Sequence, residues 1–168
     1  MYFDNGIMRR AQIGGAQIDN LTVNRLKIAG NSITSNIFHT AGDAYCPAGG
    51  TIDFLNTGFW NIGDEYDGSA TVTVSFTIDA TANYDAAAFV ELFIDNGSGY
   101  RSAASQIIGI STNNGNTYWR VGGMMIGGTD GANVRVLARI NSGKHTPRSE
   151  PRAMWVRNIA LNIGGAAR

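Results

Sequence analysis

The acids that could bind a metal ion gather at one point of this 168-residue chain, in the run Asp64-Glu65-Tyr66-Asp67-Gly68. Three acids before a glycine are typical of a calcium loop, which binds its ion through oxygen ligands. The run lacks the alternating acids and the distal glutamate of an EF-hand loop, and acid-rich loops are commonly just solvated. We therefore keep calcium binding as an alternative for this loop and assign no metal site.

Residues in a catalytic arrangement are not recognisable. Ten Asp and three Glu could supply the acid pair of a glycoside hydrolase, but nothing in the sequence selects a pair. His39 and His145 are far apart, neither has a serine in a nucleophile motif, and a single cysteine, Cys46, excludes a CxxC metal site. No lysine follows the glycine pairs at 122–123 and 127–128, which favours close backbone packing or a bulge over a phosphate loop. We expect no catalytic residue, no cofactor and no enzymatic activity.

Aromatic side chains are the remaining candidates for ligand binding. A ring face beside Asn or Asp hydrogen-bonding groups suits a sugar, although most of the rings are expected in the core or in a subunit interface. Trp60, Tyr66 and Tyr100 stand in turn-rich contexts, so we expect these three rings at the surface.

The elements that position these side chains are predicted to be β-strands. Apolar and polar residues alternate over 70–79 and over 133–140, which is the period of a half-buried strand. In a closing strand, Trp155 shares the apolar face of Ile159, and Arg157 falls on that face too, so the strand is predicted to be an edge or to meet an acid there. Further strands are predicted over residues 36–40, 50–56, 87–95, 106–112 and 117–126.

Turn residues separate these strands. The Asn-Gly and Asp-Gly steps at 96–97, 114–115 and 130–131 tolerate positive φ and predict a meander of hairpins from 87 to 140. A helix from Ala86 is the alternative for the first of these pieces. About eight short strands with almost no helical period predict an all-β fold, an antiparallel β-sandwich of jelly-roll type over residues 34–168.

Charges are segregated along the chain, although the formal net charge is zero. Residues 41–100 carry nine acids and no Lys or Arg, while residues 101–168 carry nine bases, eight of them arginine, against two acids. Because arginine suits fixed pairing with carboxylates, we expect these segments to pair within one fold or across a subunit interface, with a separate acidic face as the alternative. The absence of net positive charge argues against nucleic-acid binding, and the absence of a long apolar run argues against membrane insertion.

Residues 1–33 contain a five-residue repeat, which reads AQIGG, AQIDN, LTVNR and LKIAG from Ala11. A spacing of five fits neither a helix nor a simple strand. Four units are too few for a β-solenoid of stacked repeats, and one copy cannot bury its own apolar side chains. We therefore predict an intertwined stem, most simply a homotrimer, and keep an irregular arm on the following domain as the alternative. The predicted trimer core is formed by Ile13, Ile18, Val23 and Ile28.

The run AQIGGAQIDNLTVNRLKIAGNSIT resembles the stem-to-head transition of phage tail-tip attachment (host-specificity) proteins and related central tail fibres. In that family, A-x-I repeats precede a phrase like the one at 26–34 here, and a β-rich head follows. The strand and the Gly143-Lys144-His145-Thr146 step within 134–146 are similar to a second pattern of the family, and the closing strand 156–168 is similar to its usual finish. Residues 41–130 resemble nothing that we can place.

The resemblance implies a non-enzymatic, homotrimeric receptor-binding domain at the virion tail tip of a phage or prophage particle, made in the bacterial cytoplasm. Its implied partners are upstream tail proteins and a protein or glycan receptor on the bacterial surface. We expect receptor contact on distal loops of the head, within 60–68, 95–100, 113–116 and 130–131. The candidate contact residues are Trp60, Tyr66, Asp67, Asn96, Tyr100 and Asn114. The alternative function is a carbohydrate-binding β-sandwich module of a secreted enzyme or of a tailspike depolymerase.

Overall fold

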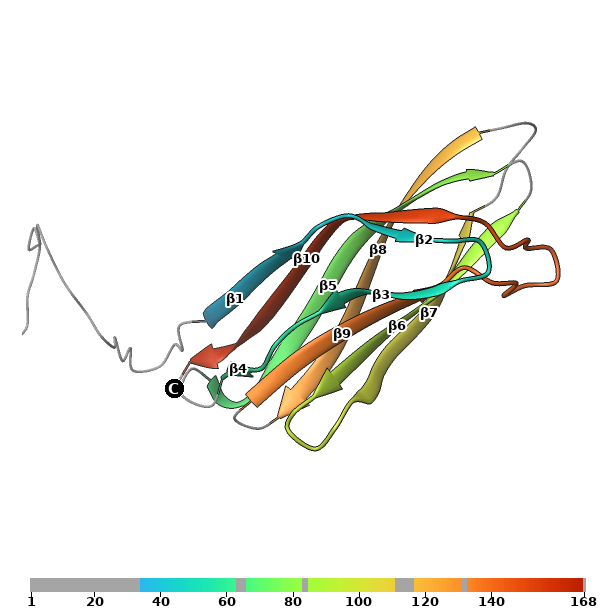
Figure 1. Cartoon of the computed structure of the whole chain (residues 1–168). Coiled ribbons are helices and arrows are strands. Elements are labelled where there is room, and N and C mark those ends of the chain that lie inside the picture. The colour runs from blue at the N-terminus through green and yellow to red at the C-terminus, as the bar shows by residue number, and fades with distance from the viewer. Residues whose placement is uncertain (1–33, 63–65, 83–84, 111–116, 131–132, 168) are drawn as a thin grey trace, which may run out of the picture.

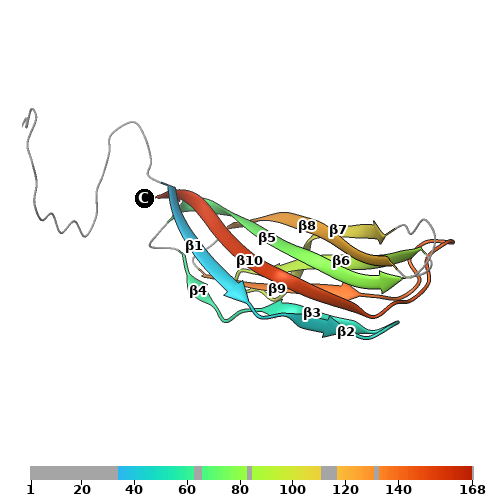
Figure 2. The ribbon, with the colours of Figure 1, turned by 90° about the horizontal axis from the view of Figure 1, so that it is seen from above.

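The computed structural model describes residues 34–62, 66–82, 85–110, 117–130 and 133–167, whose regular elements are all β-strands. They form two antiparallel sheets that lie face to face (Figures 1 and 2). Sheet A has the order β1-β10-β5-β8, with β2 also paired to β10; its strands are β1 (Thr34–Ala41), β2 (Ala44–Cys46), β5 (Tyr66–Ala82), β8 (Thr117–Asp130) and β10 (Met154–Ala167). Sheet B has the order β3-β9-β6-β7, with β4 paired to β9; its strands are β3 (Thr51–Asn56), β4 (Trp60–Asn61), β6 (Ala86–Asp95), β7 (Arg101–Ile110) and β9 (Asn133–Asn141).

The predicted all-β sandwich is confirmed, whereas the predicted meander is wrong after its first hairpin. Strands β6 and β7 are antiparallel neighbours, but β8 pairs with β5 in sheet A, and β9 returns to sheet B to pair with β6. The chain therefore crosses between the sheets at each connection after β7, as in a jelly roll. The helix alternative from Ala86 is also wrong, because that residue begins strand β6.

The core lies between the sheets and follows the predicted alternation along β5 and β9. Phe76 of sheet A meets Phe54 of sheet B, with ring centroids 5.2 Å apart. Each fully buried Val, Ile or Leu side chain stabilises the fold by roughly 1.5–3 kcal/mol relative to an exposed one. Side chains without any exposed surface from these two strands are Val72, Val74, Ile78, Val134, Val136, Ala138 and Ile140.

Two glycines of β8 allow the sheets to approach each other. A Cβ atom on Gly123 would lie 2.4 Å from the Phe76 ring of neighbouring β5 and 2.9 Å from the Ile108 side chain of sheet B, and one on Gly127 would lie 2.8 Å from the Ala103 side chain of sheet B. Larger residues at either position would push the sheets apart. The prediction of close backbone packing is therefore confirmed at these two positions.

Strand β10 contains an extra residue that exchanges its inner and outer faces. The register of β10 against β5 shifts between Arg157 and Ala160, and Asn158 has a φ of 51°, a left-handed value that Asn tolerates better than most residues. Ile159, after this bulge, points into the core, whereas Trp155, before it, is exposed on the outside of sheet A.

Two predictions about β10 are corrected by this bulge. Trp155 does not share the apolar face of Ile159, because the extra residue interrupts the period of two. The strand is not an edge either, since it lies between β1 and β5. The other prediction, that Arg157 meets an acid, is confirmed: its guanidinium pairs with Asp43 and Asp79.

The two ends of the sandwich differ in the connections between strands that lie there. We call the end at which β1 begins the proximal end; there Thr34 pairs with Ala166, and Ala167 pairs with Tyr66. The connections β4–β5, β6–β7 and β8–β9 meet at this end (Figure 1). The opposite, distal end receives the connections β2–β3, β5–β6, β7–β8 and β9–β10.

Candidate functional site

The residues predicted to contact a receptor do not gather at the distal end. Trp60, Asn96 and Tyr100 lie at the proximal end, in β4 or in the β6–β7 connection. Strand β5 begins with Tyr66 at the same end. The distal placement is therefore wrong for three of the four predicted loops. The reason is topological: the end at which a loop lies depends on how many times the chain has already run along the sandwich.

Several predicted residues lie outside the part of the chain that the structure describes. These are the four of the predicted trimer core, Ile13, Ile18, Val23 and Ile28, as well as Asn114 of the β7–β8 connection. The acids at 64–65 are also outside it, as are the side chains of Tyr66 and Asp67, so the calcium alternative for this loop stays a prediction.

Trp60 and Asn96 are held by neighbouring parts of the sandwich. The Trp60 ring is partly buried against the core and meets the His39 ring edge-on, with centroids 5.7 Å apart. Asn96 donates hydrogen bonds from its Nδ2 to the backbone carbonyl and to Oδ1 of Asp130, at 3.2 and 3.1 Å. The Trp60 contact joins β4 to β1, and the Asn96 contact joins the β6–β7 connection to the end of β8.

Tyr100 belongs to what we call the proximal cluster, formed by Phe59, Asp95, Tyr100 and Arg135. The Arg135 guanidinium carbon lies 4.6 Å from the centroid of the Phe59 ring and 4.5 Å from that of Tyr100. Its Nη2 lies 2.7 Å from Oδ2 of Asp95, whose Oδ1 accepts hydrogen bonds from two backbone amides of the β6–β7 turn. The two rings are half-exposed, at 50% and 37%, yet both are joined through one guanidinium.

These contacts set the pKa of the Asp95 carboxyl. Burial on its own raises the pKa, but the hydrogen bond and charge of Arg135, together with the amides of Gly97 and Gly99, outweigh burial. The pKa therefore lies below its ordinary value of 3.8, and Asp95 is ionised at neutral pH.

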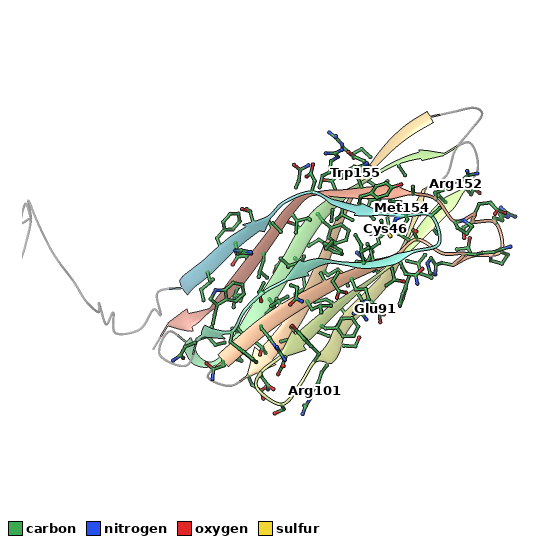
Figure 3. All side chains as sticks on the ribbon, viewed as in Figure 1. Cys46, Glu91, Arg101, Arg152, Met154 and Trp155 are labelled. Carbon is green, nitrogen blue, oxygen red and sulfur yellow. The ribbon has the colours of Figure 1, made fainter. Side chains whose placement is uncertain are left out.

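A second aromatic pair, which the sequence did not single out as a pair, lies toward the distal end. Tyr45 of β2 lies directly opposite Trp155 of β10, and their ring centroids are 5.2 Å apart at an interplanar angle of 53°. The two residues are 50% and 41% exposed. They line a groove of ≈ 460 Å³, which we call the distal groove; Figure 3 shows Trp155 on the outside of sheet A and Arg152 near the β9–β10 connection.

The distal groove also contains charged groups. Its lining includes the charged residues Asp79, Arg152 and Arg157, of which Asp79 is only 2% exposed, and small residues such as Ala48 and Pro151. The Arg157 guanidinium carbon lies 4.9 Å from the centroid of the Trp155 ring. One wall of the groove is therefore flat and aromatic, and another carries hydrogen-bonding groups.

Asp79 is the centre of an ion-pair network beneath this groove. Its carboxylate, only 2% exposed, receives Nε of Arg120 at 2.9 Å and Nη2 of the same guanidinium at 3.2 Å. Nε of Arg157 lies 2.9 Å from Oδ2 of Asp79, the oxygen that also accepts from Nη2 of Arg120, and Arg157 also pairs with Asp43. The network holds Arg157 in one place, and Arg157 in turn holds the Trp155 ring.

Ion pairs in this structure join the two segments of opposite charge, as predicted. Asp43, Asp53, Asp79 and Asp95 all come from residues 41–100, and their arginine partners all come from residues 101–168. The pairing takes place within one chain, so the first of the two predicted arrangements is confirmed for these acids.

Within the described residues, no group of three or more His, Cys, Asp or Glu side chains is placed to hold a metal ion. The same part of the chain contains no helix of a length and apolarity that could cross a membrane.

No protein-family model and no curated protein matches the chain. Solved structures that resemble it include one of infectious bursal disease virus, Gx strain, with 8% sequence identity over 86% of this chain and a TM-score of 0.44. Another is the VP2 subviral particle of the same virus, with 8% sequence identity over 92% of this chain and a TM-score of 0.38. The globular domain of zebrafish complement 1qA protein shows 12% sequence identity over 80% of this chain and a TM-score of 0.31. The chain spans 37–38% of the two viral chains and 96% of the complement domain. The fold assignment itself rests on the strand order and register described above.

Proposed function

We propose that residues 34–168 form the non-enzymatic, receptor-binding head of a phage tail fibre or tail-tip attachment protein. The resemblance of residues 11–34 to the stem-to-head transition of that family suggests the role. The observation that carries it further is the division between the two ends of the sandwich. The preceding chain enters at Thr34 on the proximal end, while the groove with exposed rings lies toward the distal end, which a head carried on a stem would turn to the cell.

A homotrimer is part of this proposal, and the outer face of sheet A supports it. Interfaces between subunits are depleted of charged residues at their centres. Two adjacent cross-strand rows on this face contain no charged residue and include three exposed apolar side chains; the rows are Phe38-Asn162-Thr73-Ile126 and Thr40-Ala160-Ser75-Met124.

The outer face of sheet B has the opposite character. There Asp53, Arg139 and Glu91 lie side by side in one cross-strand row, and Nε of Arg139 is 2.6 Å from Oδ1 of Asp53. The uncharged face belongs to the sheet that contains β1, into which the predicted stem leads. A second copy brought alongside by the stem would therefore meet sheet A.

The oligomeric state tests this part of the proposal. Wild-type chain should have a solution mass of about 54 kDa by light scattering, three times the 17.9 kDa of one chain, and should keep it on dilution. Ile18→Asp in the stem and Ser75→Arg on sheet A should each lower the mass, because each places a charge in a predicted interface. Ser105→Arg, on exposed β7 of sheet B, is the control and should leave the mass unchanged. A wild-type monomer would contradict the trimer.

Binding to cells tests the receptor-binding role. Labelled full-length chain should bind some strains in a panel of bacteria and saturate, and should compete with phage adsorption where such a phage is in hand. A chain that binds no strain of a broad panel would refute the role. Release of reducing sugar from surface polysaccharide would instead favour the tailspike depolymerase alternative, and binding to glycans by a stable monomer would favour the isolated carbohydrate-binding module.

A further inference from the structure

We infer that the distal groove is a carbohydrate-binding site, and that its ligand is a saccharide of the bacterial surface. The inference rests on the proposed function for the source of the ligand, but the chemistry of the site stands on its own geometry. Tyr45 and Trp155 give the groove its aromatic wall, and Arg152 and Arg157 are the charged residues beside it, with Asp79 beneath them.

The aromatic wall matches the apolar face of a sugar ring. A pyranose presents C–H groups on one face and hydroxyl groups at its rim, so it packs on an aromatic ring while its rim stays polar. Tyr45 and Trp155 keep about half of their surface exposed, although large rings on a soluble protein are normally more buried. Their rings are tilted by 53° to each other, which leaves an angled platform and not a closed stack.

The platform is held rigid before any ligand arrives. Register places Tyr45 opposite Trp155, and the Arg157 guanidinium, which pairs with Asp79, lies 4.9 Å from the centroid of the Trp155 ring. Side chains that are already fixed lose little conformational entropy when a ligand binds, which is where much of the affinity of a small site comes from. The bulge at Asn158 turns Trp155 outward, so the platform depends on a local backbone feature.

The remaining lining favours a sugar over an apolar peptide. Beyond its two rings, the groove is lined by the small residues Ala48, Ala80, Pro151 and Ala153 together with the charged groups. Guanidinium groups beside an exposed ring suit hydroxyl groups in fixed positions. The volume of ≈ 460 Å³ lies in the range of small-ligand sites.

The probe for a test is an array of purified bacterial surface polysaccharides, followed by titration of the best-bound polysaccharide into full-length chain. Wild-type chain should bind at least one of them. Trp155→Ala and Tyr45→Ala should each weaken that binding by about tenfold or more, as expected when a central aromatic contact is truncated, and Trp155→Phe should recover part of it. Tyr100→Ala is the matched control, because it removes an exposed ring of the proximal cluster, and it should bind like wild type.

Cells separate failure of this inference from failure of the proposed function. Periodate treatment, which cleaves vicinal diols of surface glycans, should abolish wild-type binding to cells, while protease treatment should leave it. Wild-type binding that survives periodate, or Trp155→Ala chain that binds polysaccharide and cells as wild type does, would overturn the glycan site and leave the receptor role standing. Polysaccharide binding that requires Trp155, in a chain that binds no cells, would uphold the site and overturn the receptor role.

Discussion

The proximal cluster and the distal groove are built from the same kinds of residue and differ in one placement. Each combines two exposed rings, one arginine and one buried aspartate: Phe59, Tyr100, Arg135 and Asp95 at one end, Tyr45, Trp155, Arg157 and Asp79 at the other. In the proximal cluster the Arg135 guanidinium contacts both rings, so both rings are engaged in contacts within the protein. In the distal groove the Arg157 guanidinium contacts Trp155. The Tyr45 and Trp155 rings contact each other, and both line the groove.

Composition and exposure therefore do not separate a structural contact from a binding surface. The rings at the two ends are exposed to similar extents. What separates them is that the Arg135 guanidinium lies against both proximal rings, whereas Arg157 lies against Trp155 and the two distal rings line a groove. Cation–π contacts at exposed sites are worth about 0.5–1 kcal/mol each, enough to fasten a turn to a sheet. The proximal cluster is thus expected to act on stability and the distal groove on binding.

The largest effect on this comparison is expected from Asp79→Ala. The change removes a buried carboxylate that two arginines contact and leaves their guanidinium groups close together without it. We expect the free energy of unfolding to fall by about 2–4 kcal/mol, somewhat less than for a fully buried ion pair because Arg120 is largely exposed. Urea unfolding measures this value. Loss of the network should also release Arg157 and weaken polysaccharide binding.

The control for Asp79→Ala is Asp53→Ala on the outer face of sheet B. Its partner Arg139 has a raised pKa because of the hydrogen bond and charge of Asp53, but both side chains are partly exposed. Exposed ion pairs contribute about 0–1 kcal/mol, so this variant should unfold almost as wild type does. Equal losses of unfolding free energy in the two variants would show that burial does not make the Asp79 ion pairs more stabilising than the exposed pair of Asp53.

The second-largest effect is expected from Tyr100→Ala, compared with Tyr45→Ala at the other end of the sandwich. Tyr100→Ala should lower the free energy of unfolding by about 1–2 kcal/mol, because it removes a cation–π contact, a hydrogen bond from the Tyr100 hydroxyl to Oδ1 of Asn56 and part of the packing of the β6–β7 turn. Tyr45→Ala should lower it by less, about 0.5–1 kcal/mol, and should affect polysaccharide binding instead. Chemical unfolding and titration on both variants check the pair. If the same variant showed the larger loss both in unfolding free energy and in polysaccharide binding, the two regions would not differ in role.

Much of the sandwich could be predicted from the sequence, because half-buried strands repeat with a period of two. Residues 70–79 and 133–140 follow this period, and both form strands with the predicted core faces; Leu137 is the exception, an apolar residue on the predicted outer face that is only 7% exposed. The charge segregation likewise predicted that arginines of the last third would pair with the acids before them. These patterns depend on each residue's own character, so they are visible without knowing the topology.

The distal groove could not be predicted in the same way. Tyr45 and Trp155 are 110 positions apart, and their pairing depends on β2 lying beside β10. Trp155 faces outward because of one extra residue at the bulge, which a strict period of two assigns to the other face. The four predicted loops could not all lie at the distal end, because strands that run the length of the sandwich place successive connections at opposite ends. The Asn in the left-handed conformation at 158 is the one local signal that could have indicated the break.

The smallest effect is expected in the pH dependence of stability, because it is confined to acid. The pKa of Asp95 in the folded chain lies below its ordinary value of 3.8, so the folded state binds a proton less readily than the unfolded state. The stability that the ionised carboxylate contributes is therefore complete above 3.8 and is lost as the pH falls through the lower, folded-state pKa. Asp95→Asn has no such group to titrate. Unfolding curves for both chains between about pH 5 and about pH 2 should converge as the pH falls, and curves that stay parallel would show that Arg135 and the turn amides do not favour the charged form.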